Sequence, residues 1–247
     1  MRLLLINPNT TEAMTDQLTE VARRVAGPSV DIVPVTASRG VPYIASRAEA
    51  QIAGVEVLEI IAEHGKGTDA AIIAAFGDPG IIAARELFDM PVVGMAEAAL
   101  VTAALMGERF GVVTFSPLLA RWYVESVAVT GLTDRFTGVR CPKTPPSEVG
   151  NVMHDMRDDL LALTNQATEE DGADVVILGG APLAGLAPLL AEASPGLLVD
   201  PISAATAQAI ALSRLGTSYA HRTTRPAPKP SKGLGPALAA IIAGETS

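Results

Sequence analysis

The stretch DAAIIAAFGDPG, residues 69–80, decides the fold of this chain. After Asp69 comes an unbroken apolar run, residues 70–76, and the sequence GDPG, residues 77–80, then turns the chain sharply. A short apolar run that ends in glycine and proline is typical of a strand buried on both faces of a parallel sheet. Functional loops leave the carboxyl ends of such strands, so we expect a site at the loop that follows.

A second copy of this stretch lies in the other half of the chain. The sequence GADVVILGGAPLAGL, residues 172–186, aligns without a gap on residues 67–81, so that Gly180 matches Ala75. Both residues stand where a predicted strand becomes its loop. Two further pairs of strand segments repeat in the same order: residues 2–9 with 109–117, and residues 90–99 with 196–205. The sequence therefore predicts a duplicated α/β unit.

Length and composition favour a globular protein that acts on small molecules. The 247 residues, 49% of them hydrophobic and 18% charged, suit one large domain or two small α/β lobes. A formal net charge of -9 argues against nucleic acid or an anionic membrane as the main partner, because both select for basic surfaces. We expect a small-molecule partner, no nucleic acid and no membrane.

The ends of the chain and its cysteine content indicate a compartment. No apolar run reaches the roughly 18 residues expected of a membrane span. The N-terminal apolar run is interrupted at residues 7–9 by Asn-Pro-Asn, which predicts a first strand and not a signal peptide. The lone Cys141 excludes an internal disulfide framework. We expect a cytoplasmic protein.

Strand and helix patterns alternate along the chain. Strands are predicted at residues 3–6, 30–35, 70–76, 91–95, 110–114, 136–140, 175–178 and 197–199. Helices are predicted from residue 9 onward and at residues 47–63, 81–88, 98–106, 118–129, 153–170, 202–212 and 237–243. The Pro-rich, basic segment before the last helix is predicted to wrap the surface as a tail.

Polar residues near the first strands have a functional and a structural interpretation. Asn9 and Glu12 have capping-box-like spacing, and free N–H groups at a helix start can bind a carboxylate. Asn9 and Thr10 therefore either hold an anion or only cap a helix. Arg47 can hold a carboxylate through two hydrogen bonds, or it can form a surface salt bridge at its helix start. Tyr43, in the same segment, is open to both interpretations.

The same ambiguity applies to four residues beyond later strands. Glu97 either complements a helix dipole or belongs to the site. Thr114 and Ser116 correspond roughly to the loop at residues 7–9, so their hydroxyls can face the same cleft, although Ser116 precedes a proline and suits a helix cap. Asp78 is a candidate base, or it bonds its own turn.

Four motifs carry a resemblance to a known family. They are INPNT at residues 6–10, FGDPG at 76–80, PVVGMAEAA at 91–99 and GADVVILGGAPLAGLA at 172–187. They resemble the aspartate/glutamate racemase superfamily, and most closely its hydantoin and allantoin racemase branch, over roughly residues 2–215. The resemblance implies two pseudosymmetric α/β lobes, each with a parallel four-stranded sheet flanked by helices, with the active site in the cleft between them. It also implies a homo-oligomer and cofactor-independent proton transfer next to a carbonyl. We assign residues 1–97 and about 207–247 to the first lobe and 98–206 to the second.

The family's two catalytic cysteines fall on positions that hold no thiol here. In the family one thiol removes a proton from one face of a carbon and a second returns a proton to the other face. Those positions are Ala75 and Gly180, and Cys141 matches neither motif. Three explanations stay open: decarboxylation, hydrolysis or isomerisation of a small carboxylate or cyclic amide in the same cleft; binding without turnover; or an engineered replacement of a natural cysteine by Ala75.

We predict a cofactor-independent enzyme that acts on a small carboxylate or cyclic amide, with a silent ligand-binding protein as the alternative. The predicted catalytic positions are Ala75, Gly180, Asp78, Glu97 and Ser116. The predicted substrate-binding residues are Asn9, Thr10, Arg47, Phe76, Gly77, Thr114, Ala181 and Pro182. His64, His154 and His221 show no metal-ligand spacing, so no metal site is expected. The glycine-rich stretches lack the context of a dinucleotide fingerprint.

Overall fold

Two parallel sheets form the framework of the chain, which a computed structural model describes over residues 1–220 and 224–245. The strands of the first sheet lie in the order β2-β1-β3-β4 and those of the second in the order β6-β5-β7-β8. The first sheet contains β1 (Arg2–Asn7), β2 (Asp31–Thr36), β3 (Ala70–Ile73) and β4 (Val92–Gly94). The second contains β5 (Phe110–Val113), β6 (Phe136–Arg140), β7 (Val175–Leu178) and β8 (Leu197–Val199). The predicted α/β fold with two four-stranded parallel sheets is confirmed.

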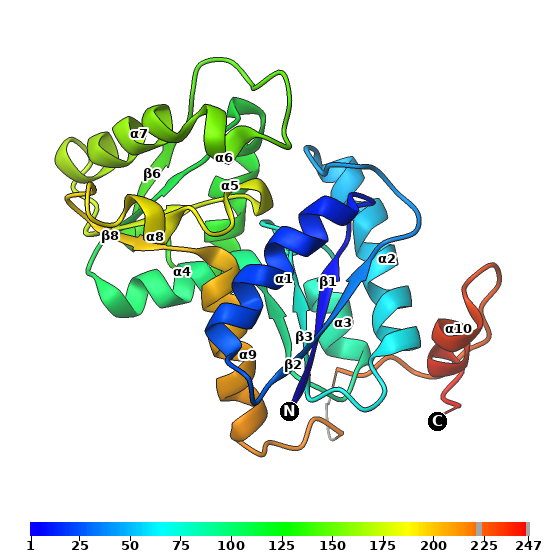
Figure 1. Cartoon of the computed structure of the whole chain (residues 1–247). Helices are drawn as coiled ribbons and strands as arrows, with labels where there is room; N and C mark the ends of the chain where they lie inside the picture. Colours follow the sequence, from blue (N-terminus) through cyan, green and yellow to red (C-terminus); the bar gives the residue numbers. More distant parts are fainter. Residues whose placement is uncertain (221–223, 246–247) are drawn as a thin grey trace.

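The sequence repeat has a structural counterpart in this strand order. β1 lies between β2 and β3, and β5 lies between β6 and β7 in the equivalent place. The two repeated stretches supply β3 and β7, and every residue of these strands is buried. Helices cover both faces of each sheet (Figure 1), which explains why the central strands are continuous apolar runs.

Helices connect the strands and cover the sheets. They are α1 (Glu12–Ala26), α2 (Arg47–His64), α3 (Ile81–Leu87), α4 (Met95–Met106), α5 (Pro117–Thr130), α6 (Val152–Asp155), α7 (Arg157–Glu169), α8 (Ala187–Leu190), α9 (Pro201–Arg214) and α10 (Pro236–Ile242), with short 3-10 turns at η1 (Thr133–Arg135) and η2 (Ala181–Leu183). The prediction of one continuous helix at residues 153–170 is wrong. Met156 has non-helical dihedral angles (φ -111°, ψ 15°) and divides it into α6 and α7.

Two helices tie distant parts of the chain together. α9 follows β8 of the second sheet but packs against β3 and β4 of the first, and also contacts α1 and α4. α10 packs against α2 (Figure 1), and its Leu238 joins the core cluster that contains Val57 and Ile61. The C-terminal helix therefore packs against a helix that covers the first sheet.

No helix within residues 1–220 and 224–245 combines the length and the apolar character needed to cross a membrane.

Candidate active site

A small cavity lies between the two lobes, where loops at the carboxyl ends of both sheets meet. Its volume is about 20 Å³. It is lined by Asn9, Tyr43, Ile44, Ala75, Phe76, Trp122, Tyr123, Gly180 and Ala181. The first lobe contributes residues that follow β1, β2 and β3, and the second contributes α5 and the loop after β7. The cleft between the lobes is thus the place where the two repeated loops converge.

The two strand-end positions face this cavity with almost no side chain. Ala75 is 8% exposed, and Gly180 has a φ of 129°, which side chains rarely adopt. A Cβ atom at Gly180 would lie 2.7 Å from a ring carbon of Phe115 and 3.5 Å from the hydroxyl of Tyr123. A side chain at this position therefore requires the Phe115 ring to move.

Asn9 offers the cavity a free amide group. Its side-chain oxygen accepts hydrogen bonds from the Thr11 backbone N–H (2.9 Å) and from the amide of buried Asn7 (3.0 Å). These bonds fix the orientation of the Asn9 amide, and its NH₂ group has no acceptor among the described residues. The capping-box interpretation is wrong, because the N-cap of α1 is Thr11, two residues after Asn9. Thr10 donates its backbone N–H to the carbonyl of Val41 (3.0 Å) and does not line the cavity.

The ionisable side chains in the cavity lining are two tyrosines, one from each lobe. The ring of Tyr43 lies 6.0 Å from that of Phe115, and the ring of Tyr123 lies 4.5 Å from that of Phe76. Burial raises the pKa of both phenols well above its usual range. The neighbouring Thr114 lowers the pKa of Tyr123 by a smaller amount. The buried hydroxyl of Thr114 makes no hydrogen bond of normal geometry with any described residue. At neutral pH both phenols are protonated and act as hydrogen-bond donors.

Backbone donors add to these side chains. The N–H groups of Ala75, Phe76 and Gly180 have no hydrogen-bond acceptor within residues 1–220 and 224–245. They occupy equivalent places after β3 and β7, so each lobe brings unpaired donors to the same cavity. An oxygen-rich, anionic or carbonyl-bearing ligand matches this set of groups.

Two predicted catalytic acids lie outside the cavity and already have partners. The carboxylate of Asp78 accepts the backbone N–H groups of Ala96 (2.8 Å) and Glu97 (2.7 Å) at the start of α4. Burial raises the pKa of Asp78 to about 7, although these two donors act in the opposite direction. The carboxylate of Glu97 binds both guanidinium NH groups of Arg85, at 3.2 and 2.6 Å.

Three further candidates also have structural partners. The Ser116 hydroxyl accepts the backbone N–H of Leu118 (3.4 Å) as the N-cap of α5. Arg47 forms two hydrogen bonds with Glu125, at 2.8 and 2.7 Å, which join α2 of the first lobe to α5 of the second. The Pro182 carbonyl accepts the side-chain amide of Gln17 at 3.3 Å.

The structure brings together Asn9, Ala75, Phe76, Gly180 and Ala181 of the predicted site residues. Thr10, Arg47, Gly77, Asp78, Glu97, Thr114, Ser116 and Pro182 lie outside the lining of this cavity, and the roles of all these residues stay predictions. Sequence reasoning missed Tyr123 and Trp122 as cavity residues. The one sequence signal for these two residues is their position near the start of the helix that follows β5, at the carboxyl end of that strand.

Neither the free thiol nor the described histidines belong to a cluster of metal-ligand type in residues 1–220 and 224–245. Cys141 follows β6 and is partly buried, and burial raises the pKa of its thiol. It does not line the interlobe cavity. Across residues 1–220 and 224–245, no group of three or more His, Cys, Asp or Glu side chains is arranged to hold a metal ion. His221 lies outside the described residues.

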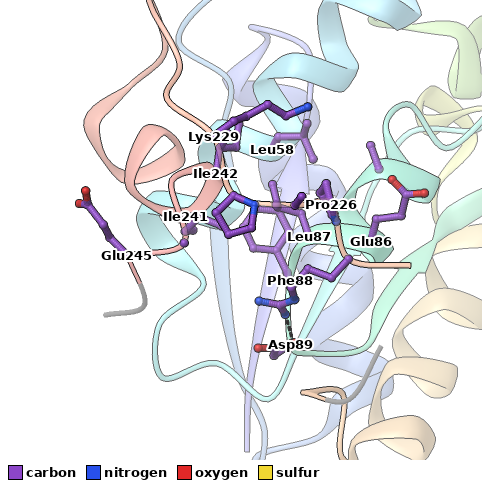
Figure 2. A pocket seen from close by; sticks show the side chains of 15 residues that line it. Leu58, Glu86, Leu87, Phe88, Asp89, Pro226, Lys229, Ile241, Ile242 and Glu245 are labelled. Carbon is purple, nitrogen blue, oxygen red and sulfur yellow. Dashed lines mark hydrogen bonds and ion pairs between the residues drawn. The ribbon is translucent and has the colours of Figure 1, made fainter. Parts of the chain in front are cut away.

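Several cavities are larger than the interlobe cavity, and two of them are lined by residues of α3. One, of about 320 Å³, lies between α3, the start of α4 and α5, on the other side of Trp122. The other, of about 350 Å³, lies between α10 and the first lobe. Figure 2 shows its apolar walls, formed by Leu58, Leu87, Phe88, Ile241 and Ile242, with Asp89 at one end. Asp89 forms an ion pair with Arg225, which also lines this cavity.

Comparison with known proteins gives consistent relatives over almost the whole chain. Residues 3–209 match the family model described as Asp/Glu/Hydantoin racemase. A hydantoin racemase of Paenarthrobacter aurescens is 33% identical over 233 residues, which cover 93% of this chain and 99% of the relative. The structure of allantoin racemase from Klebsiella pneumoniae has a TM-score of 0.87 and 32% sequence identity, covering 94% of this chain and 96% of that one.

A more distant structure shares the fold alone. Arylmalonate decarboxylase has a TM-score of 0.59 and 16% sequence identity, covering 89% of this chain and 97% of that one.

The family match and the similar racemases agree with the two equivalent sheets and the cavity between them. The chain belongs to the Asp/Glu/hydantoin racemase family.

Proposed function

We propose that this chain is a cofactor-independent enzyme that binds a small carboxylate or cyclic amide in the interlobe cavity and acts at the carbon next to its carbonyl. The observation that carries the proposal is the convergence of the two repeated loops, after β3 and β7, on one cavity with unpaired donors. The named activity of the P. aurescens relative supports the substrate class and a racemase-like reaction.

The donors of the cavity suit a carbonyl or carboxylate oxygen. The groups that can donate are the Asn9 NH₂ group, the phenols of Tyr43 and Tyr123, and the backbone N–H groups of Phe76 and Gly180. The Asn9 NH₂ group and the two backbone N–H groups have no acceptor among the described residues. Donors that are fixed before the reaction stabilise the negative charge that develops on a carbonyl oxygen when the adjacent carbon loses a proton. The enolate-like state is therefore bound more tightly than the substrate, as acceleration of proton transfer requires.

We also propose that Ala75 and Gly180 occupy the positions of the family's two catalytic cysteines. Proton transfer in this chain then uses no thiol, and the phenols of Tyr43 and Tyr123, one from each lobe, are the groups that exchange protons with the substrate carbon. A phenol with a raised pKa is a strong base once ionised, but little of it is ionised at neutral pH. Racemisation by this route is slow at pH 7 and accelerates in alkali.

Decarboxylation is a second candidate, favoured by the neutral state of both phenols. In that reaction the bond between the carbon and the carboxylate breaks, and its electron pair forms the enolate held by the cavity donors. The phenol then gives its proton to the carbon, and solvent returns a proton to the phenolate. No base is needed, so a cavity that contains only protonated phenols has the required groups.

Incubation in heavy water with hydantoins, amino acids and substituted malonates, followed by NMR and mass spectrometry, tests these reactions. A Cys141→Ser background removes the single native thiol, so that any thiol chemistry comes from an introduced residue. The unmodified chain is compared with Ala75→Cys in that background, and with Tyr43→Phe and Tyr123→Phe.

Each result has one meaning. Deuterium at the substrate carbon, lost in a tyrosine variant, supports thiol-free proton transfer, whereas loss of carbon dioxide identifies a decarboxylase. Turnover by Ala75→Cys alone marks residue 75 as a disabled catalytic position, and an alanine codon in the source gene then rules out an engineered replacement. Saturable binding without turnover in every variant overturns the enzymatic proposal in favour of a binding protein.

A further inference from the structure

Trp122, on α5, stands between two cavities. It lines the interlobe cavity of about 20 Å³ together with Phe76, and it lines the adjoining pocket of about 320 Å³ together with Gly77. It is the single tryptophan of the chain and is 9% exposed. The indole ring therefore separates a very small site from a much larger one.

The interlobe cavity is too small for the proposed ligand as it stands. A volume of about 20 Å³ is close to the room that one water molecule needs. A cyclic amide does not fit unless a wall moves. Displacement of the Trp122 ring opens the cavity toward the pocket of about 320 Å³, which falls within the usual range of ligand pockets.

Within the part of the chain that the structure describes, the ring is held by packing contacts. A Cβ atom at Gly77 would meet three indole ring atoms within 3.0 Å, so the ring rests directly on bare backbone of the loop after β3. Gly77 has a φ of 114°, which also disfavours a side chain. The indole N–H makes no hydrogen bond within the described residues. Moving the ring therefore breaks no polar contact.

The pocket behind the ring combines apolar walls with charged groups. Ile81, Ile82 and Val129 supply apolar surface. Arg85 and Glu97 form one ion pair at its edge, and Arg47 and Glu125 form another. The side chains of the second pair are 48% exposed, so this pair is readily exchanged for contacts with a polar group of a ligand.

We propose that this pocket receives the substituent of a ligand whose amide or carboxylate head binds in the interlobe cavity, and that Trp122 determines which substituents enter. This inference rests on the proposed function. The substituent class is an apolar group with a polar end, such as a hydroxybenzyl group, which contacts the isoleucines along its length and the ion pairs at its tip.

A fluorine label reports the ring without any ligand. Because the chain has one tryptophan, 5-fluorotryptophan gives a single labelled site. We expect two exchanging ring environments in ¹⁹F relaxation experiments. In the variant Ser126→Phe, which fills the pocket from the same helix, the second environment disappears. A single environment in the unmodified chain overturns the gating part of the inference.

A pair of ligands tests the pocket itself. Hydantoin and 5-(4-hydroxybenzyl)hydantoin share one head, and only the second has a substituent. We expect Ser126→Phe to weaken binding of the substituted ligand at least tenfold and to leave hydantoin unchanged. The matched control is Val124→Phe, an exposed position on α5 that lines neither cavity, and it is expected to change neither affinity. Equal loss for both ligands, or no loss for the substituted one, contradicts the assignment of the pocket.

The outcomes separate this inference from the proposed function. Suppose that neither ligand binds, but that the fluorine label shows two environments and Ser126→Phe reduces them to one. This result supports movement of the Trp122 ring and overturns the proposed substrate class. If hydantoin exchanges its C5 hydrogens for deuterium but Ser126→Phe has no effect on binding of the substituted ligand, the proposed function is supported and the pocket assignment is overturned.

Discussion

At the scale of single residues, the two strand-end positions differ in what they tolerate. Ala75 has no positive φ and already carries a Cβ atom, so a cysteine there adds only a sulfur atom. Gly180 has a φ of 129° and lies against Phe115. The two positions, equivalent in the sequence repeat, are therefore not equivalent as sites for a restored thiol.

This difference predicts the stability of glycine substitutions. We expect Gly180→Ala to lower the free energy of unfolding by about 2–3 kcal/mol, because backbone strain and contact with Phe115 add together. Gly131→Ala is the matched control: Gly131 also has a positive φ (72°) but has no atom within 4 Å of a Cβ, so it is expected to lose only about 1 kcal/mol. Urea denaturation measures both. Equal losses of unfolding free energy in the two variants would show that the Phe115 ring moves aside without destabilising the fold.

The phenols predict how activity depends on pH. If a tyrosine removes the substrate proton, the rate follows the ionised fraction of a phenol whose pKa lies above its usual range. Deuterium exchange is then expected to rise about tenfold per pH unit from pH 7 to pH 9, since the phenolate fraction rises by that factor below the pKa. Tyr123→Phe or Tyr43→Phe removes this dependence, whereas Tyr219→Phe, outside the cavity, keeps it. A rate that is flat over this range excludes a phenolate base.

At the scale of secondary-structure elements, the loop after β3 fixes the start of α4. Asp78 lies in that loop with a φ of 50°, and its carboxylate accepts the N–H groups of Ala96 and Glu97. A Cβ atom at Gly94 would collide with this carboxylate, so the glycine before α4 makes the contact possible. A residue 18 positions away in sequence thus takes the place of a local N-cap.

The pKa of Asp78 gives this contact a pH signature. Burial raises the pKa from 3.8 to about 7, so between these values the folded chain binds more protons than the unfolded chain. The free energy of unfolding contributed by this group is therefore expected to fall as pH rises from about 4 to about 7. Asp78→Asn keeps a residue type that tolerates positive φ but cannot ionise, so its free energy of unfolding is expected to show no such fall with pH. At pH 5 the variant is expected to be about 1 kcal/mol less stable, because the start of α4 loses part of its cap.

Denaturation at several pH values from 4 to 8 measures the effect. Asp134→Asn, at an exposed position, is the control and is expected to follow the unmodified chain. Parallel curves for the unmodified chain and Asp78→Asn would show that the two backbone donors cancel the effect of burial on the pKa of Asp78.

At the scale of the whole molecule, polar contacts tie the lobes together on two sides of the cleft. Gln17 of α1 donates to the carbonyls of Pro182 (3.3 Å) and Ala184 (2.9 Å) in the second lobe. On another side, Arg47 of α2 binds Glu125 of α5. The small cavity volume indicates that a wall of the cleft moves before a ligand binds, and these contacts restrain movement of one lobe against the other.

The Arg47 pair is the weaker tie, because both of its side chains are about half exposed. We expect Glu125→Gln to speed ligand association, followed by stopped-flow fluorescence of Trp122, by no more than about fivefold, since an exposed pair contributes at most about 1 kcal/mol. Salt at 1 M should speed association to the unmodified chain but not to the variant. Glu20→Gln, which removes an ion pair within α1, is the control and should have no effect. An unchanged rate in Glu125→Gln shows that this pair does not limit entry.

The sequence by itself determined the framework of this protein. Each strand of the structure overlaps a predicted one, and the repeated stretches form β3 and β7 at equivalent places. These features are readable because apolar runs and their glycine and proline ends act locally. The positions of Ala75 and Gly180 at the cavity followed from the same local pattern and from the family motifs.

Only the tertiary structure decided which polar groups remain free. Asp78, Glu97 and Ser116 are plausible catalytic residues in sequence, but backbone N–H groups and Arg85 occupy their oxygens. Tyr43 and Tyr123 come from different lobes, and their burial and raised pKa values exist only where the lobes meet. Whether a polar side chain is free to contact a ligand depends on hydrogen-bond partners that are far away in the sequence. Tertiary packing decides which of these partners lie within reach.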